Sequence, residues 1–90
     1  EIKDNTSIEV FPQPAKERLN IRMKINKNVP NGQLQVIDLM GRTIHSMAID
    51  LRSGQNDFTI EEINTLSAGY YILKVQDTEL DLTKSLFIAR

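Results

Sequence analysis

The sequence predicts an all-β protein built as an antiparallel sandwich, with about seven short strands in two sheets. Three observations support this prediction. Apolar and polar residues alternate in several short runs, residues that favour turns separate these runs at regular spacing, and no run has the length and period of a stable helix. A closed antiparallel barrel would give a similar pattern and is the alternative architecture.

The most apolar strand follows Gly69 and is expected to lie in the centre of a sheet. One of its faces is almost wholly apolar, and the other face carries a tyrosine and an isoleucine beside a lysine, so both edges should have neighbouring strands. The inward face is expected to hold Tyr71, Leu73 and Val75, and the other face Tyr70, Ile72, Lys74 and Gln76.

Two strands are expected in the first third of the chain. Residues 1–7 are polar and without a pattern, which predicts a flexible lead-in. Residues 8–11 predict a short edge strand that ends at Pro12 and Pro14, because proline fixes φ and cannot donate to a sheet ladder. Residues 19–25 have the clearest alternation in the chain and predict a half-buried strand.

The middle of the chain predicts two more strands and a bulge. Pro30-Asn31-Gly32 is expected to form a tight hairpin turn, because Asn-Gly tolerates positive φ. A strand over residues 34–39 then ends at Gly41, and another covers residues 43–51. Ile44 breaks the parity that the later apolar residues of this run follow, so a β-bulge or a change of neighbouring strand is expected there.

The last third predicts two short strands besides the central one. A turn over residues 53–56 precedes alternation over residues 57–61. Residues 61–65 can make one helical turn, which is too short to nucleate a stable helix. The final strand covers residues 80–88. All the glycines are expected in turns, at Gly32, Gly41, Gly54 and Gly69.

The composition excludes several classes of function. The 90 residues carry a formal net charge of −1 with both signs dispersed, which gives no electrostatic signal for nucleic acid or an anionic membrane. The absence of cysteine excludes a disulfide framework and a thiolate metal site. No apolar run is long enough to span a bilayer. The start at Glu1, without an initiator methionine, predicts that the chain is a piece of a longer protein.

The sequence offers no motif for catalysis or for a cofactor. His45 has no partner motif and is expected to be an ordinary strand residue. Neither a nucleophile elbow nor a glycine-rich phosphate loop is present, so we expect no enzyme activity, no catalytic residues and no cofactor. The aspartates match no calcium-binding loop, and sandwich turns use aspartate for hydrogen bonding. These aspartates are Asp38, Asp50, Asp57, Asp77 and Asp81. Asp38, just before Met40-Gly41, is expected to cap its own turn.

Tyr71 narrows the predicted fold to an immunoglobulin-like sandwich. It follows a Leu-x-x-Gly corner at the start of the penultimate strand, which is similar to the tyrosine corner of that class, and its hydroxyl is expected to find a backbone partner. Tyr70, on the other face, is expected to pack under a neighbouring strand or loop. The alternative for Tyr70 is a carbohydrate-binding surface centred on its ring.

Several separated motifs resemble those of one family. Residues 10–21 are similar to a short strand that ends in Pro-Asn-Pro-Ala and is followed by an alternating strand, with Gln13 in place of the asparagine. Residues 37–42 match an Asp-Leu-x-Gly-Arg turn, and residues 66–75 match Leu-x-x-Gly-x-Tyr before an apolar strand. The last motif is a basic residue, Lys84, which leads the final strand. In these motifs the chain resembles the C-terminal sorting domain (type A) of cargo proteins of the type IX, or Por, secretion system.

The resemblance implies a specific function. Domains of this family are folded secretion signals that direct a cargo protein across the outer membrane of a Gram-negative bacterium. A sortase-like cysteine peptidase usually removes them and attaches the cargo to the cell surface. The implied partners are the translocon components and this peptidase, and the implied locations are the periplasm in transit and then the outer membrane, the cell surface or the medium. Residues 8–90 would form the domain, with the cut in or before residues 1–7.

The resemblance also implies which residues matter. The translocon is expected to recognise the last strand, through Lys84, Leu86, Phe87, Ile88 and Arg90. The positions that match the structural motifs of the family are Pro12, Pro14, Asp38, Gly41, Gly69 and Tyr71. Free strand edges would also allow a weak homodimer. The alternative function is an immunoglobulin-like binding or spacer module of an extracellular enzyme or adhesin.

Overall fold

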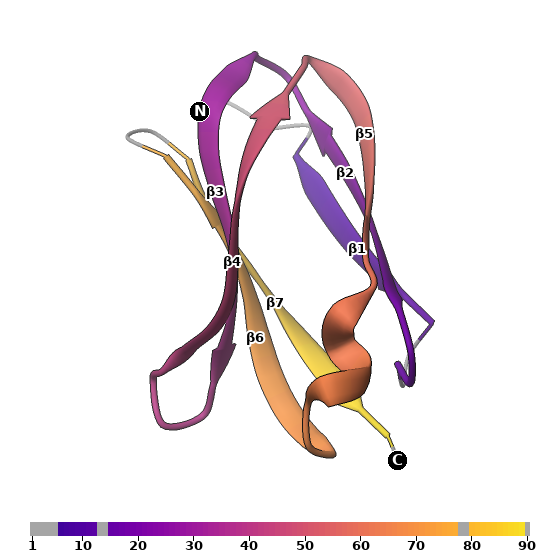
Figure 1. The fold of residues 1–90 in the computed structure, drawn as a ribbon. Helices are drawn as coiled ribbons and strands as arrows, with labels where there is room; N and C mark the ends of the chain where they lie inside the picture. Colours follow the sequence, from indigo (N-terminus) through magenta and orange to yellow (C-terminus); the bar gives the residue numbers. More distant parts are fainter. Residues whose placement is uncertain (1–5, 13–14, 78–79, 90) are drawn as a thin grey trace.

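Seven antiparallel strands form two facing sheets in the part of the chain that the structure describes (Figure 1). The structure is a computed structural model, and it describes residues 6–12, 15–77 and 80–89. The elements are β1 (Ser7–Phe11), β2 (Leu19–Ile25), β3 (Val29–Asp38), β4 (Thr43–Leu51), β5 (Gly54–Ile60), the 3₁₀ helix η1 (Glu62–Thr65), β6 (Gly69–Gln76) and β7 (Asp81–Ile88).

The core lies between the two sheets and is made by alternate residues of their strands. In β2 the apolar positions are buried, while Asn20, Arg22 and Lys24 face outward. No polar side chain is buried among the described residues. The fully or nearly fully buried strand residues include Leu19, Ile21, Met23, Ile25, Val29, Leu34, Val36, Ile49, Leu51, Tyr71, Leu73, Val75, Leu86 and Ile88.

The order of the strands is that of an immunoglobulin-like sandwich. One sheet has the order β1-β2-β5, and the other has the order β4-β3-β6-β7. The chain therefore crosses between the sheets after β2, after β4 and after β5, which gives Greek-key connections. The predicted sandwich is confirmed, and the barrel alternative is wrong. The predicted central position of β6 is also confirmed, because β6 pairs with both β3 and β7.

The predicted hairpin turn at Pro30-Asn31-Gly32 is wrong. These residues lie inside β3, and Gly32 is buried opposite Ile49 of β4. The pairing skips a residue between Val29 and Gly32, so the Asn-Gly pair marks a β-bulge and not a turn. Gly32 also contradicts the expectation that every glycine lies in a turn, because it lies inside β3. A hairpin turn here would need β2 to pair with β3, but β2 pairs with β1 and β5.

The predicted irregularity at Ile44 is confirmed. Val36 pairs with His45 and Ile37 pairs with Thr43, so Ile44 is the extra residue of a bulge in β4. This bulge explains why Ile44 differs in parity from Ile49 and Leu51.

The two ends of the predicted domain are only partly described. β1 begins at Ser7, which is paired with Lys24 of β2, and residues 1–5 of the expected lead-in lie outside the described residues. Pro14 and Arg90 also lie outside them. No described helix is long and apolar enough to cross a membrane.

Candidate functional site

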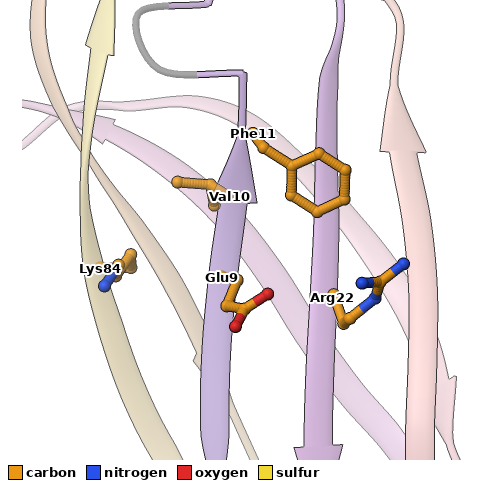
Figure 2. Close-up of a pocket in the computed structure, with 5 residues that line it drawn as sticks. All are labelled: Glu9, Val10, Phe11, Arg22 and Lys84. Carbon is orange, nitrogen blue, oxygen red and sulfur yellow. The ribbon is translucent and has the colours of Figure 1, made fainter.

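β7, the strand in which the sequence places the recognition residues, is an edge strand of the four-stranded sheet. It pairs with β6 over its whole length, from Gln76 opposite Asp81 to Gly69 opposite Ile88. Its other edge faces the side of the sandwich where β1 lies, as Figure 2 shows. A strand in this position can offer its second edge to a partner, except at its C-terminal end, where Ala15 bonds to Phe87 and Ala89.

Alternation along β7 divides its residues between two environments. Leu86 and Ile88 are fully buried in the core. Phe87 points to the outer face and is 37% exposed. Lys84 is also exposed, but it has the parity of Leu86 and Ile88 and therefore lies on the opposite face from Phe87, on the side where β1 lies. In the folded domain a partner can therefore touch Phe87 and Lys84, whereas Leu86 and Ile88 hold the strand on the core.

Ala15 fixes the C-terminal end of β7. Its N–H donates to the carbonyl of Phe87 at 2.9 Å, and its carbonyl accepts from the N–H of Ala89 at 2.8 Å. This parallel bridge to Ile88 buries Ala15 completely and connects the β1–β2 segment to the opposite sheet. Alternation could not have predicted it, because Ala15 stands alone between two strands.

A shallow depression of about 580 Å³ lies between β1 and β7 (Figure 2). Glu9, Val10 and Phe11 line it from β1, Arg22 lines it from β2, and Lys84 lines it from β7. The carbon at the centre of the Arg22 guanidinium lies 5.4 Å from the centre of the Phe11 ring, which is a cation–π distance. The depression therefore presents charges of both signs beside an exposed ring.

Arg22 is held in place by a second contact. Its Nε donates to Oδ1 of Asp57 at 3.0 Å. This hydrogen bond is the main reason that the pKa of Asp57 is lowered from its ordinary value, with a smaller contribution from Gln55. Both partners are largely solvent-exposed, so the pair orients Arg22 more than it stabilises the fold.

The turn between β3 and β4 is organised by Asp38. Its Oδ1 accepts hydrogen bonds from the backbone N–H groups of Met40 and Arg42, each at 2.9 Å, and its Oδ2 accepts from Nε of Arg42 at 2.8 Å. Gly41 has a φ of +88°, which favours glycine at that position. The predicted capping of this turn by Asp38 is confirmed, and the turn displays Leu39 and Met40 to solvent.

We expect Asp38→Asn to destabilise the domain at neutral pH and to matter less in acid. The backbone N–H of Arg42 is the largest cause that lowers the pKa of Asp38 below its ordinary 3.8, with the Arg42 side chain and the Met40 N–H adding to it. Because the folded pKa is depressed, this stabilisation is present above the unfolded pKa and is lost as pH falls through the folded pKa.

Urea unfolding at about pH 7 and about pH 3 checks this prediction. Asp50→Asn is the matched control, because the Asp50 carboxylate makes only a 3.9 Å contact with Arg52 and caps no turn. If the difference in the free energy of unfolding between wild type and Asp38→Asn is the same at both pH values, the charge of Asp38 does not stabilise the turn.

Tyr71 forms the predicted tyrosine corner. Its hydroxyl donates to the carbonyl of Ser67 at 2.8 Å, and its side chain is buried. Asp38 of β3 and Leu86 of β7 are its partners in the strand pairing. Gly69 has a φ of +146° at the start of β6. The corner therefore places the first part of β6 against the last part of β7.

The described residues form no candidate metal site. Within residues 6–12, 15–77 and 80–89, no three His, Asp or Glu side chains lie together so that they could hold a metal ion. Tyr70 is 62% exposed, so the expectation that it packs under a strand or loop is wrong. What the arrangement can do is present an edge strand, a depression and an outer sheet face to another molecule.

The strand order and the tyrosine corner place the chain in the class of immunoglobulin-like sandwiches. The structure of dimeric latent PorU from Porphyromonas gingivalis is similar, with a TM-score of 0.67 and 15% identity over 98% of this chain. The chain spans 10% of the length of that protein, and an identity this low shows the fold alone. No curated protein matches the sequence.

The family model described as the secretion system C-terminal sorting domain matches residues 9–89. The chain belongs to this family, as its motifs predicted. It is the C-terminal signal domain of the type IX secretion system, which directs a cargo protein to the cell surface or out of the cell. The alternative of a general binding or spacer module is not needed to explain the sequence or the fold.

Proposed function

We propose that the secretion machinery recognises this domain through the exposed residues of β7, with Phe87 on the outer face and Lys84 at the edge beside β1 as the contact residues. The observation that carries the proposal is the position of β7 at the edge of its sheet, with these two side chains exposed. Leu86 and Ile88 support recognition indirectly, by holding β7 on the core. We assign Arg90 to the same recognition, from the family motif alone.

The proposal includes the path of the cargo. The domain folds in the periplasm, engages the type IX translocon, and crosses the outer membrane with its cargo. A sortase-like cysteine peptidase then cuts before Ser7, because Ser7 begins a paired strand and a peptidase needs unpaired backbone. The domain itself performs no catalytic step in this scheme. A weak homodimer through free strand edges stays a prediction, which sedimentation of the isolated domain would test.

A secretion assay tests the role of β7. Residues 1–90 are fused behind a periplasmic fluorescent reporter in a host that has the type IX system, and the fraction of reporter outside the outer membrane is measured. We expect the Lys84→Ala/Phe87→Ala fusion to stay in the periplasm. Both side chains are exposed, so the fold should survive their removal.

A double variant away from β7 and from the depression provides the control. Met40 is 81% exposed on the β3–β4 turn, and Lys24 is an exposed lysine of β2. The Lys24→Ala/Met40→Ala fusion should be secreted like wild type. Equal secretion of both double variants would contradict the proposed role of β7.

A further inference from the structure

The outer face of the four-stranded sheet carries an exposed apolar patch next to the recognition strand. We call Tyr70, Ile72 and Phe87 the outer patch; they are 62%, 37% and 37% exposed. Tyr70 and Phe87 are directly opposite each other on β6 and β7, with ring centres 4.8 Å apart and ring planes at 40°. The patch thus lies across the two strands at the end where β7 finishes.

The ring contact alone does not explain the outer patch. Cross-strand aromatic pairs stabilise a sheet, but Tyr70 keeps most of its surface in water and contributes nothing to the core between the sheets. The inward residues of the same strands, such as Leu73 and Leu86, already bury the apolar surface that the fold requires. Exposed apolar surface that gathers on one face is typical of an interaction site.

The described strand residues that pair directly with Ile72 are uncharged. Ile72 is flanked by Ile37 on β3 and Ser85 on β7. In the next row, Lys74 is flanked by Gln35 and Thr83, and Lys84 lines a hollow together with Ile72, so two lysines border the patch. The uncharged patch itself complements another uncharged, apolar protein surface better than it complements a polyanion or a charged membrane.

The size of the outer patch favours a transient partner. A fully exposed aromatic residue has about 200 Å² of surface, so the exposed parts of the three side chains total roughly 250–300 Å². A stable dimer needs about 800 Å² from each partner. The patch is too small to hold a second copy by itself, and it fits a partner that must bind the domain and then release it.

We propose that the outer patch is a second docking surface for a protein of the secretion machinery, which covers Tyr70 and Ile72 with an uncharged apolar surface while β7 is recognised. This inference rests on the proposed function, and it adds two residues of β6 to the recognised surface. Phe87 belongs to both surfaces, so the two contacts are continuous across the β6–β7 pair.

The secretion assay described above, with a variant of the outer patch, tests the inference. The variant is Tyr70→Thr/Ile72→Thr, because threonine is polar and suits a strand. We expect the secreted fraction to fall about ten-fold, as for the loss of one central aromatic anchor. The Tyr70→Thr/Ile72→Thr domain is also exported to the periplasm in excess, without a reporter. It should no longer compete with the wild-type fusion for the secretion machinery. Thermal unfolding checks that the variant is folded.

Two further variants keep the test decisive. Met40→Thr removes a side chain that is 81% exposed on the β3–β4 turn, and it should be secreted normally. If the double variant is unfolded, Tyr70→Lys replaces it, because a lysine is tolerated in solvent at this position but opposes an uncharged partner surface. Tyr70→Lys should then show the same loss of secretion and of competition.

The outcomes separate the two proposals. Normal secretion and competition by the folded outer-patch variant, with loss in Lys84→Ala/Phe87→Ala, would overturn the inference and leave the role of β7 intact. Normal secretion of both variants would overturn both. If the outer-patch variant is secreted normally but loses a binding to a glycan array that the wild-type domain shows, the partner of the patch is a carbohydrate. This outcome would also overturn the inference.

Discussion

Leu86→Ala is expected to lower the free energy of unfolding by about 2–5 kcal/mol, as for other leucine truncations that leave a cavity. Leu86 is fully buried and lies opposite Tyr71 in the β6–β7 register, so the cavity would open beside the tyrosine corner. A domain of this size has roughly 5–13 kcal/mol of total stability, so the loss is a large part of it. Urea unfolding measures the change, and the fusion should be lost from the cell surface.

Phe87→Ala is the control for this prediction, because the next residue of the strand points to the opposite face. Phe87 contacts Tyr70 but fills no core space, so its truncation should cost about 1 kcal/mol. Both variants should reduce secretion, but only Leu86→Ala should do so by melting the domain. Equal urea midpoints for the two variants would contradict the assignment of Leu86 to the core and of Phe87 to the exposed outer face.

Local patterns were sufficient to predict most of the strands, the turn that Asp38 caps and the tyrosine corner. Alternation located β2 and β6 because each has one face on the core, and the parity break at Ile44 predicted the bulge in β4. Asp38 and Tyr71 were predicted correctly because the partners of both side chains lie within four residues in the sequence.

The features that the sequence could not predict depend on contacts between distant segments. The Asn31-Gly32 pair has the composition of a hairpin turn, but β2 pairs with β5 and β1, so the chain crosses to the other sheet before β3. Ala15 reaches Phe87 across the molecule. The exposure of Tyr70 depends on which elements cover the outer face, and none of the described ones does.

The candidate site was predictable in part. The division of β7 between buried Leu86 and exposed Phe87 follows from alternation, and the sequence placed these two side chains on opposite faces. That β7 is the edge of its sheet follows only from the pairing of β3 with β6, which involves residues far apart in the sequence. The role of β7 in secretion came from the family motifs and not from the physical pattern.

Gly32→Val is expected to lower the free energy of unfolding by about 1–3 kcal/mol, as for overpacking of a core. A Cβ atom at Gly32 would lie 3.2 Å from Cγ1 of Ile49 and 3.4 Å from Cγ1 of Val29, and valine adds two methyl groups to this space. The φ of Gly32 is outside the left-handed region, so the cost comes from the neighbours and not from the backbone.

A double-mutant cycle with Ile49→Ala checks this origin, because the second change removes the Cγ1 atom that the new side chain would meet. The two changes together should cost less than the sum of their separate costs. Gly41→Ala is the matched control: its φ of +88° strains any other residue, nothing lies within 4 Å of its Cβ position, and it should not couple to Ile49. Strictly additive costs for Gly32→Val and Ile49→Ala would contradict the pairing of these residues across β3 and β4, because a glycine in a hairpin turn would not depend on the size of residue 49.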